Sequence, residues 1–286
     1  MKKIWILLFL LYAVWGYTAE KELILRHCGD LGKFFLRYKH PGKIFKVQKS
    51  HAEQIQKELE KNLLRMAITT QVPPDKSKKW KIIPLAAQAP ILAVNPENTM
   101  RNISRKDAEL LLYKLQGSWR SLGGPRARIH LYRKTDHSLP PPVMRPVHQH
   151  PEQNRKVFAS KLPDAVPGTK TKKKYDPSKV LLFQTDNDSS SFSQLFTDPY
   201  GIACFDVTRF HEDRVPLLSV DNIPPTAEHI RNGKYPLTTI YYLILPLDPT
   251  PEEQKLQNYI LSRQFAETLF ENGWLPLYVP GKTEKK

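Results

Sequence analysis

The sequence predicts an α/β fold with a mixed sheet, in which a second set of alternating elements is inserted into the first. Three observations carry this prediction. After an apolar leader, β-branched strand patterns alternate with amphipathic helix patterns, which is typical of a mostly parallel sheet. A proline-rich stretch at 138–157 excludes a continuous helix, and the alternation resumes after it. A long β-branched and aromatic strand pattern at 235–245 then leads into a helix pattern at 250–271.

The first alternating set has the order βαβαβ. Its strand patterns are short apolar runs, and its helix patterns carry apolar residues at helical spacing. We expect strands at 22–26, 43–48 and 64–69, helices at 31–38 and 50–62, and two further β-rich segments at 79–86 and 89–95.

Residues 102–133 predict a helix, a loop and a strand. Ser104 with Asp107 is a helix-capping pattern, and an apolar stripe at i, i+3, i+4 and i+7 follows it. Gly117 is expected to end the helix. The segment Leu122–Pro125 has turn composition, and Arg128–Arg133 alternates as a strand does.

The remaining elements alternate again. The last helix carries Pro251 in its first turn, with two acidic residues near its positive dipole end. We expect helices at 153–162, 189–196, 224–231 and 250–271, and strands at 179–184, 201–206, 215–220 and 235–245.

The first residues have the composition of a secretory signal peptide. Lys2 and Lys3 precede an apolar run, Ile4–Trp15, that is short for a membrane span. We therefore expect residues 1–19 to be a cleaved signal and the protein to be periplasmic; an uncleaved N-terminal anchor is the alternative. For Cys28 and Cys204, export permits a disulfide, but two buried free thiols are favoured.

The composition is strongly basic, with a formal net charge of +16. Such a charge favours anionic partners through long-range attraction. The densest run, Thr169–Lys174, lies in a loop pattern without interleaved aromatic residues, so we expect no specific nucleic-acid site. Salt-sensitive binding to an acidic envelope surface or to nucleic acid, through the basic surface as a whole, is a third alternative.

No sequence pattern supports an enzyme. We find no nucleophile elbow, zinc-protease motif, Walker loop or dinucleotide-binding glycine motif. His137, His148 and His150 lie close together, but no cysteine or suitably spaced fourth ligand accompanies them, so exposed loop histidines are favoured over a metal site. We expect no cofactor.

Several motifs in order resemble phosphate-type periplasmic solute-binding proteins. The block N-I-S-R-K-D-A-E-L-L-L-Y-K-L-Q-G-S-W-R-S-L-G-G-P, followed by a strand ending in Arg133, is similar to the second lobe of that family. Four further pieces match in sequence order: 186–196, the strand segment P-Y-G-I-A-C-F-D at 199–206, Y-P-L-T at 235–238, and the last helix with G-W-L-P-L at 273–277.

The resemblance implies a two-lobed, Venus-flytrap (type II) fold, each lobe a mixed, mostly parallel sheet flanked by helices. Lobe 1 would comprise 20–95 and 236–286, and lobe 2 would comprise 96–235, with hinges near 94–97 and 233–237. It also implies a monomeric, exported binding protein without covalent chemistry. Such a protein would hold a small oxyanion such as phosphate in the interlobe cleft for an ABC permease.

Site residues are carried over from the family position by position. Helix starts offer unpaired N–H donors, and an arginine offers a forked charged contact, which suits any oxyanion. The residues that the resemblance places at the ligand are Gly29, Asp30, Ser50, Thr69, Thr70, Arg133, Thr135 and Ser138.

The chain departs from the family at several of these positions. Lys134–Leu139 replaces a glycine-rich anion loop, and without glycine the backbone does not readily reach φ > 0. Asp30 would cap the next helix and put a carboxylate where an anion should sit, while Ser50 would cap its own helix. Thr70 replaces an acidic residue that accepts a proton from hydrogen phosphate, which relaxes the rejection of fully ionised anions. The second hypothesis is therefore a non-transport scaffold or sensor that has lost phosphate binding.

Overall fold

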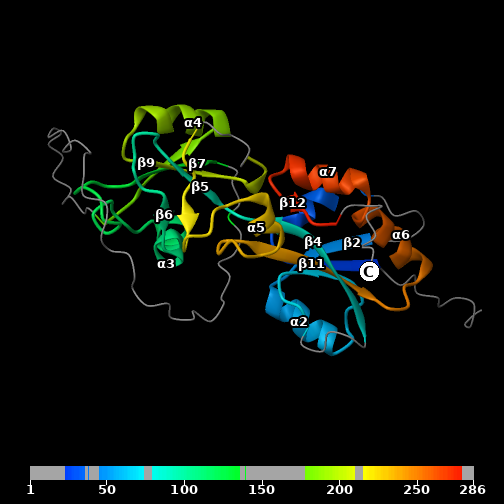
Figure 1. The fold of residues 1–286 in the computed structure, drawn as a ribbon. Helices are drawn as coiled ribbons and strands as arrows, with labels where there is room; N and C mark the ends of the chain where they lie inside the picture. Colours follow the sequence, from blue (N-terminus) through cyan, green and yellow to red (C-terminus); the bar gives the residue numbers. More distant parts are fainter. Residues whose placement is uncertain are drawn as a thin grey trace, which may run out of the picture. The chain divides into compact units, whose positions relative to one another are not determined.

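The computed structural model describes residues 23–35, 38, 45–73, 79–135, 139, 178–209 and 215–278. The described residues form two compact units (Figure 1). Unit 1 comprises the residues up to Ile83 together with Tyr242–Ser262, and unit 2 comprises Pro84–Tyr241 together with the residues from Arg263 onward. The chain passes from one unit to the other within two strands, β4 (Trp80–Gln88) and β11 (Thr239–Pro246), and a third time between Ser262 and Arg263. The predicted lobe bounds stay a prediction.

Unit 1 is built on three parallel strands. In register, β1 pairs with β2 on one side and with β3 on the other, and β11 pairs antiparallel with β3. The predicted βαβαβ order is present, although the first helix is only a short 3₁₀ turn. Its elements are β1 (Leu23–His27), η1 (Leu31–Phe35), β2 (Phe45–Lys49), α2 (Ala52–Glu60), β3 (Ala67–Thr69) and α6 (Pro251–Ile260).

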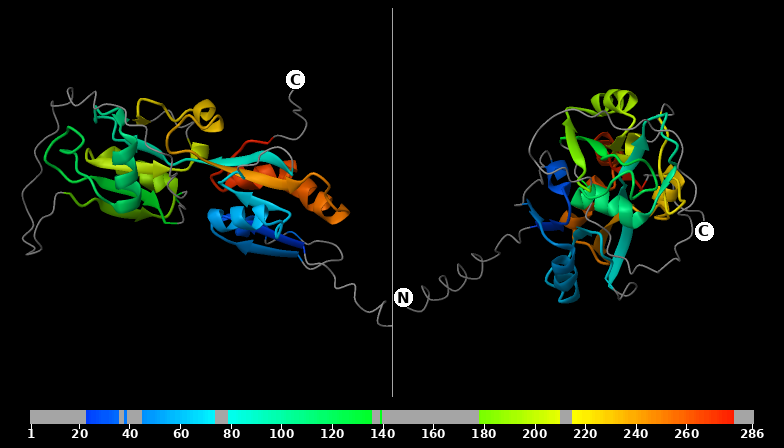
Figure 2. Two further views of the ribbon diagram at one scale, coloured as in Figure 1. Left: turned by 90° about the horizontal axis from the view of Figure 1, so that it is seen from below. Right: turned by 90° about the vertical axis from the view of Figure 1, so that its left-hand side faces the viewer.

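The core of unit 1 lies between this sheet and its helices. Ile55 and Leu59 lie one helical turn apart on α2, and both are fully buried where α2 packs against β1 and β3 (Figure 2). Arg26 of β1 forms an ion pair with Glu58 of α2 at 3.0 Å. Arg26 and Leu25 point to opposite faces of the strand, so the buried Leu25 lies on the face away from α2. Gly32 of η1 lies against the ring of His27, which shares the face of Leu25.

The largest sheet has six strands in the order β12-β4-β11-β3-β1-β2. Its last strand, β12 (Leu275–Pro276), belongs to the G-W-L-P-L segment and pairs antiparallel with β4. The sheet is therefore mixed, as predicted, with its parallel part in unit 1.

Unit 2 contains a four-stranded sheet in the order β5-β9-β7-β8. β7 is parallel to both β8 and β9, and β5 is antiparallel to β9. The other elements of the unit are short. The bounds are β5 (Ile91–Val94), β6 (Asn102–Ile103), α3 (Arg105–Glu109), η2 (Leu110–Lys114), β7 (His130–Lys134), β8 (Leu181–Thr185), α4 (Asp188–Thr197), β9 (Gly201–Phe205), η3 (Val207–Arg209), β10 (Ser219–Val220), α5 (Ala227–Arg231) and α7 (Arg263–Glu271).

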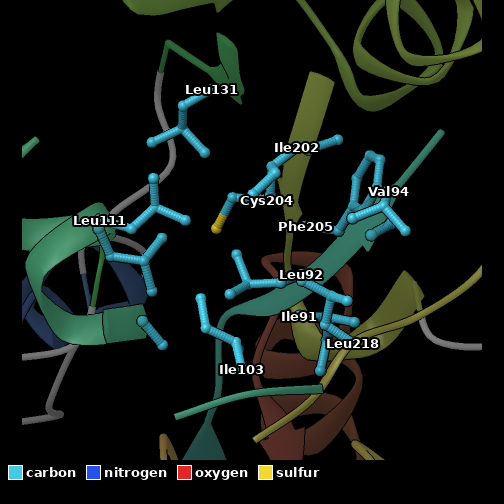
Figure 3. Packing of buried hydrophobic residues seen from close by; sticks show 14 of the residues in the cluster. Ile91, Leu92, Val94, Ile103, Leu111, Leu131, Ile202, Cys204, Phe205 and Leu218 are labelled. Atoms are coloured by element: carbon cyan, nitrogen blue, oxygen red, sulfur yellow. The ribbon is translucent and has the colours of Figure 1, made fainter. Parts of the chain in front are cut away.

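Helices cover both faces of this sheet. A Cβ at Gly201 would lie 3.1 Å from Leu195 of α4 and from the Tyr132 ring, which places α4 on the Tyr132 face. On the other face, Leu111 of η2 points toward Leu131 and Cys204 (Figure 3). Because strand side chains alternate between faces, each face of the sheet contributes to the core of unit 2.

The G-S-W-R-S-L-G-G-P motif has a structural role in unit 2. The indole N–H of buried Trp119 donates to the backbone oxygen of Tyr200 at 2.9 Å, and the amide of Gly124 donates to the oxygen of Trp119 at 2.7 Å. Gly123 has φ of 89°, which favours glycine. Two of the motifs behind the family resemblance are thus in direct contact.

The predicted last helix is wrong in one respect, because 250–271 forms two helices. α6 ends at Ile260 and α7 begins at Arg263. The buried residues explain the break: Leu256 and Ile260 are four apart, whereas Ile260 and Phe265 are five apart, which moves the apolar stripe off one helix face. The predicted capping of this segment is confirmed, since Thr250 and Glu253 form a complete capping box.

The helix that begins after Ser104 also differs in detail. Ser104 caps it through a bond from the Asp107 amide, as predicted. The helix widens into the π turn η2 and ends at Leu115 with φ of 51°, not at Gly117. Leu115 packs against the core of unit 2, and this contact compensates for the strained left-handed conformation.

Other predicted bounds shift at positions where turns replace strand. Residues 235–238 form a turn, in which the Thr238 amide bonds to the Tyr235 oxygen, so the strand predicted from 235 begins at Thr239. The strand predicted at 215–220 is reduced to β10, with an isolated bridge at Leu217. Cys28 and Cys204 are both buried and form no disulfide with each other, as favoured.

Several predictions fall outside the described residues. These are the signal peptide at 1–19, the helix at 153–162, the basic run at 169–174, Ser138, and His137 with His148 and His150. Among the helices of the described stretches, none combines the length and apolarity needed to cross a membrane.

Candidate functional site

The carboxyl ends of the three parallel strands of unit 1 bring most of the predicted site residues together. β1, β2 and β3 end at His27, Lys49 and Thr69, which lie at one edge of the sheet. The Ser50 amide donates to the His27 oxygen at 2.9 Å, and the Cys28 amide donates to the Ile68 oxygen at 3.0 Å. Ligands of open α/β sheets bind outside this kind of edge. We call residues 27–30, 49–51 and 69–71 the strand-end cluster.

Gly29 and Asp30 follow β1 in this cluster. Gly29 has φ of 74°, a conformation that lets the backbone turn sharply between β1 and η1. The carboxylate of Asp30 accepts a hydrogen bond from the ammonium of Lys49 at 2.6 Å. The carboxylate of Asp30 is present, but its charge is balanced by Lys49 at the end of the neighbouring strand, which the sequence did not predict.

Ser50 does not cap α2, contrary to the expectation. The N-cap is His51, whose side chain makes no capping hydrogen bond. Since the first amides of a helix have no intrahelical partner, the start of α2 is a donor-rich part of the cluster. Ser50, which the resemblance places at the ligand, lies directly before the N-cap of α2.

Thr69 and Thr70 enter the cluster from β3. Thr69 is fully buried, and its hydroxyl accepts from the Gln71 amide at 3.2 Å, whereas Thr70 is partly exposed. The thiol of Cys28 lies 3.9 Å from the Thr70 hydroxyl. Burial raises the pKa of the Cys28 thiol, and the hydrogen bonds with Thr70 oppose that effect only in part. Cys28 is therefore a neutral thiol in the cluster at neutral pH.

Arg133 and Thr135 lie at the carboxyl end of β7 in unit 2. Arg133 is partly buried and pairs in register with Gln184 and Cys204. It follows Leu131 by two residues and so shares its face of the strand, the face on which η2 packs. The Thr135 amide and hydroxyl both donate to the Thr185 oxygen, at 2.9 and 3.1 Å. Thr135 thus extends the β7–β8 pairing, and Ser138 lies outside the described residues.

Two members of the strand-end cluster were missed by the sequence reasoning. Lys49 pairs with Asp30, and its position at the end of a predicted strand, next to Ser50, was the available signal. His27 is almost completely buried, and nothing local in the sequence indicates that. Across the described ranges, no group of three or more histidine, cysteine or acidic side chains is arranged to hold a metal ion.

Known proteins were compared with this chain in sequence and in structure. No family model matches the sequence. The phosphate-binding protein PstS of Bacillus subtilis is 20% identical over 187 residues, which is 65% of this chain and 54% of that protein. The match therefore spans about half the length of this curated relative.

Solved structures of phosphate receptors superpose on most of the chain. A possible phosphate-binding protein from Planctomyces limnophilus gives a TM-score of 0.60 at 14% identity, covering 90% of this chain and 93% of that one. An ABC-type phosphate transport receptor from Vibrio cholerae gives 0.53 at 14% identity, covering 89% and 99%. PstS from Borrelia burgdorferi gives 0.53 at 16% identity, covering 89% and 98%.

The chain therefore has the two-lobed α/β fold of type II periplasmic binding proteins. Within that class, its fold is that of the phosphate receptors named above, as the sequence resemblance predicted.

Proposed function

We propose that this protein is an exported solute-binding protein of the phosphate-receptor type. It holds a small oxyanion at the strand-end cluster of unit 1, and Arg133 in unit 2 is a further ligand residue. Its partner is an ABC permease, and no covalent chemistry is involved.

One observation carries the proposal: the strand-end cluster gathers donors suited to an oxyanion. Lys49, the hydroxyls of Ser50 and Thr70 and the first amides of α2 all belong to elements that meet at this edge. Because Lys49 and Asp30 neutralise each other, the remaining N–H and O–H dipoles decide the sign of the ligand, and they favour an anion.

The alternative function is a scaffold or sensor that no longer binds phosphate. The specific observation in its favour is Thr135, whose hydroxyl donates to Thr185 and is thereby engaged in the sheet. The glycine-poor segment that begins at Lys134 supports the same alternative.

A thermal-shift panel separates the two functions. Purified protein is heated with phosphate, sulfate or molybdate, and with sodium chloride at the same ionic strength to correct for screening of the basic surface. A ligand at about 100 times its Kd adds about 2.7 kcal/mol and raises the Tm by about 5–10 °C. A shift for one oxyanion beyond that for chloride supports binding, and none for any anion supports the scaffold.

Variants locate the site. Lys49→Ala and Arg133→Ala should each reduce the anion-dependent shift, because the first leaves the Asp30 carboxylate uncompensated and the second removes a proposed cationic contact. Lys57→Ala on α2 and Arg120→Ala in unit 2 remove the same charges from exposed positions and are the matched controls. Equal losses in all four variants would indicate nonspecific attraction to the basic surface.

A further inference from the structure

His27 is an unusual group at the end of β1. Its side chain is 3% exposed, and its Nδ1 atom is buried without a hydrogen-bond partner among the described residues. A buried polar atom without a partner is destabilising, so a native structure that keeps one calls for a reason. His27 belongs to the strand-end cluster, but the proposed function gives its ring no role.

The position of the ring is fixed by its neighbours. His27 shares the face of Leu25 on β1, the face away from α2. A Cβ added at Gly32 of η1 would lie 3.1 Å from His27 Nε2, so the absence of a side chain at Gly32 makes room for the ring. The backbone oxygen of His27 accepts from the Ser50 amide, which ties the residue to the strand-end cluster.

We propose that His27 links a proton to anion binding, so that the ring is neutral in the empty site and becomes protonated when an oxyanion occupies the strand-end cluster. This inference rests on the proposed function and adds a pH-dependent affinity to it.

The chemistry of the ring gives the reason. A protonated imidazole presents N–H donors on both nitrogens, and in the empty site Nδ1 has no acceptor for one. A bound oxyanion supplies both a negative charge and acceptor oxygens, which favour the charged ring. We therefore expect a neutral ring in the empty site and a charged ring in the filled site.

The surrounding groups set the direction of the effect. Burial lowers the pKa of His27 and the charge of Lys49 lowers it further, while the nearby Cys28 backbone and the charge of Asp30 act in the opposite direction. On η1 the charged residue is Lys33, whose ammonium lies over the Phe34 ring. The neighbouring end of β3 contributes uncharged residues.

The sign of the linkage follows. An anion raises the His27 pKa above its value in the empty site, so binding takes up a proton between these two pKa values. Anion affinity is therefore greatest at pH values below the His27 pKa of the empty site. It decreases as the pH rises toward the His27 pKa of the anion-bound site, and above that value it stays constant at its lowest level. A rise of one pKa unit on binding gives a tenfold change in affinity.

Sulfate is the suitable probe, because it does not titrate near neutral pH as phosphate does. Isothermal titration calorimetry is run on the full mature chain between about pH 5 and pH 8, in two buffers with different ionisation enthalpies, which counts the protons taken up. We expect proton uptake that peaks at about half a proton between the two pKa values, and affinity about tenfold weaker at the higher pH. In His27→Gln, sulfate should still bind, but without proton uptake or this pH dependence.

His51→Gln is the matched control, since His51 is also in the cluster but exposed. Loss of proton uptake in His51→Gln, or its persistence in His27→Gln, overturns the proposal. If His27→Gln does not fold, NMR titration of the wild-type imidazole replaces it: a His27 pKa that rises with sulfate supports the linkage, and an unchanged pKa overturns it. Sulfate binding without proton uptake overturns this inference alone, whereas no anion binding at any pH overturns the proposed function as well.

Discussion

The ammonium of Lys49 lies 2.6 Å from the carboxylate of Asp30, across the carboxyl ends of two adjacent parallel strands. Lys49 stands opposite His27 in the register of β1 and β2, which places it beside the loop that carries Asp30. This pair changes the electrostatics expected from the sequence, because a carboxylate that would repel an anion is held by a cation. It also restrains that cation, which is then less available to a ligand.

The first prediction concerns Asp30→Asn. Removing the carboxylate frees Lys49 and removes a repulsive charge, so oxyanion affinity should rise. The side chains of Lys49 and Asp30 are 63% and 44% exposed, so solvent screens the pair; it is worth about 1 kcal/mol at most, and we expect a gain of up to about fivefold. Calorimetry with sulfate measures it. Glu60→Gln on α2 makes the same charge change away from the cluster, and an equal gain there would contradict the local explanation.

The second prediction concerns the thiol of Cys28. Burial raises its pKa, and thiolate is the reactive form, so alkylation of the native protein should be slow. Its rate should still rise about tenfold per pH unit at pH values where an ordinary thiol, with a pKa of about 8.5, begins to level off. Mass spectrometry of iodoacetamide labelling in a Cys204→Ser background measures this rate.

The same variant unfolded in urea is the reference for Cys28. There the thiol should label faster, with a midpoint near the ordinary thiol value. A native rate that levels off at lower pH than the unfolded rate would show a stabilised thiolate and contradict the prediction.

Much of this fold could be predicted from the sequence because the main strands and helices have strong local patterns. The elements that were missed depend on distant partners: β6 and β12 have two residues each, and they exist only through pairing with β10 and β4. The break between α6 and α7 was visible in principle, as the spacing from Ile260 to Phe265 departs from helical periodicity.

The site was predicted less completely than the fold. Ser50, Thr69 and Thr70 were placed by resemblance, and the structure gathers them at one sheet edge. The Lys49–Asp30 pair could not be predicted, because it depends on the register between β1 and β2. The burial of His27 depends on the packing of η1 over β1, which no local pattern encodes.

The third prediction concerns Asp198 in unit 2. Its carboxylate accepts from the Tyr132 hydroxyl at 2.8 Å and contacts Nδ1 of His130 at 2.7 Å, and its other oxygen accepts from the Tyr200 amide. Burial alone would raise its pKa, but these hydrogen bonds outweigh burial and lower it. Since the folded pKa is below the unfolded value of about 4, the carboxylate stabilises the fold above that value.

Asp198→Asn should therefore lower the free energy of unfolding at pH 7. The difference should shrink as the pH falls through the unfolded and then the folded pKa of Asp198, because the wild-type carboxyl is then protonated as well. Urea denaturation at several pH values measures it. Asp186→Asn, at an exposed position nearby in sequence, should show little change at any pH. A deficit that is constant down to low pH would show that Asp198 acts through packing and not through its charge.

The fourth prediction concerns Arg65, which holds a buried carboxylate in unit 1. Glu253 is almost fully buried, and it accepts from Arg65 Nε at 2.8 Å, from Nη2 at 3.1 Å and from the Thr250 amide at 2.8 Å. Arg65→Ala leaves this carboxylate with the backbone donor but no cation. Since hydrogen bonds to charged groups are worth about 1.5–3 kcal/mol, we expect the free energy of unfolding to fall by about that amount.

The pair of Arg263 with Glu267 is the matched control for Arg65. It has the same Nε–carboxylate distance of 2.8 Å, but both side chains are mostly exposed. Because solvent screens an exposed i, i+4 pair, Arg263→Ala should cost about 0.3–0.5 kcal/mol. Urea unfolding of the two variants compares them directly. We expect the larger loss of unfolding free energy for Arg65→Ala, because a buried charge is costly to leave unpaired. Equal losses in the two variants would mean that the burial of Glu253 adds nothing to the strength of its ion pair.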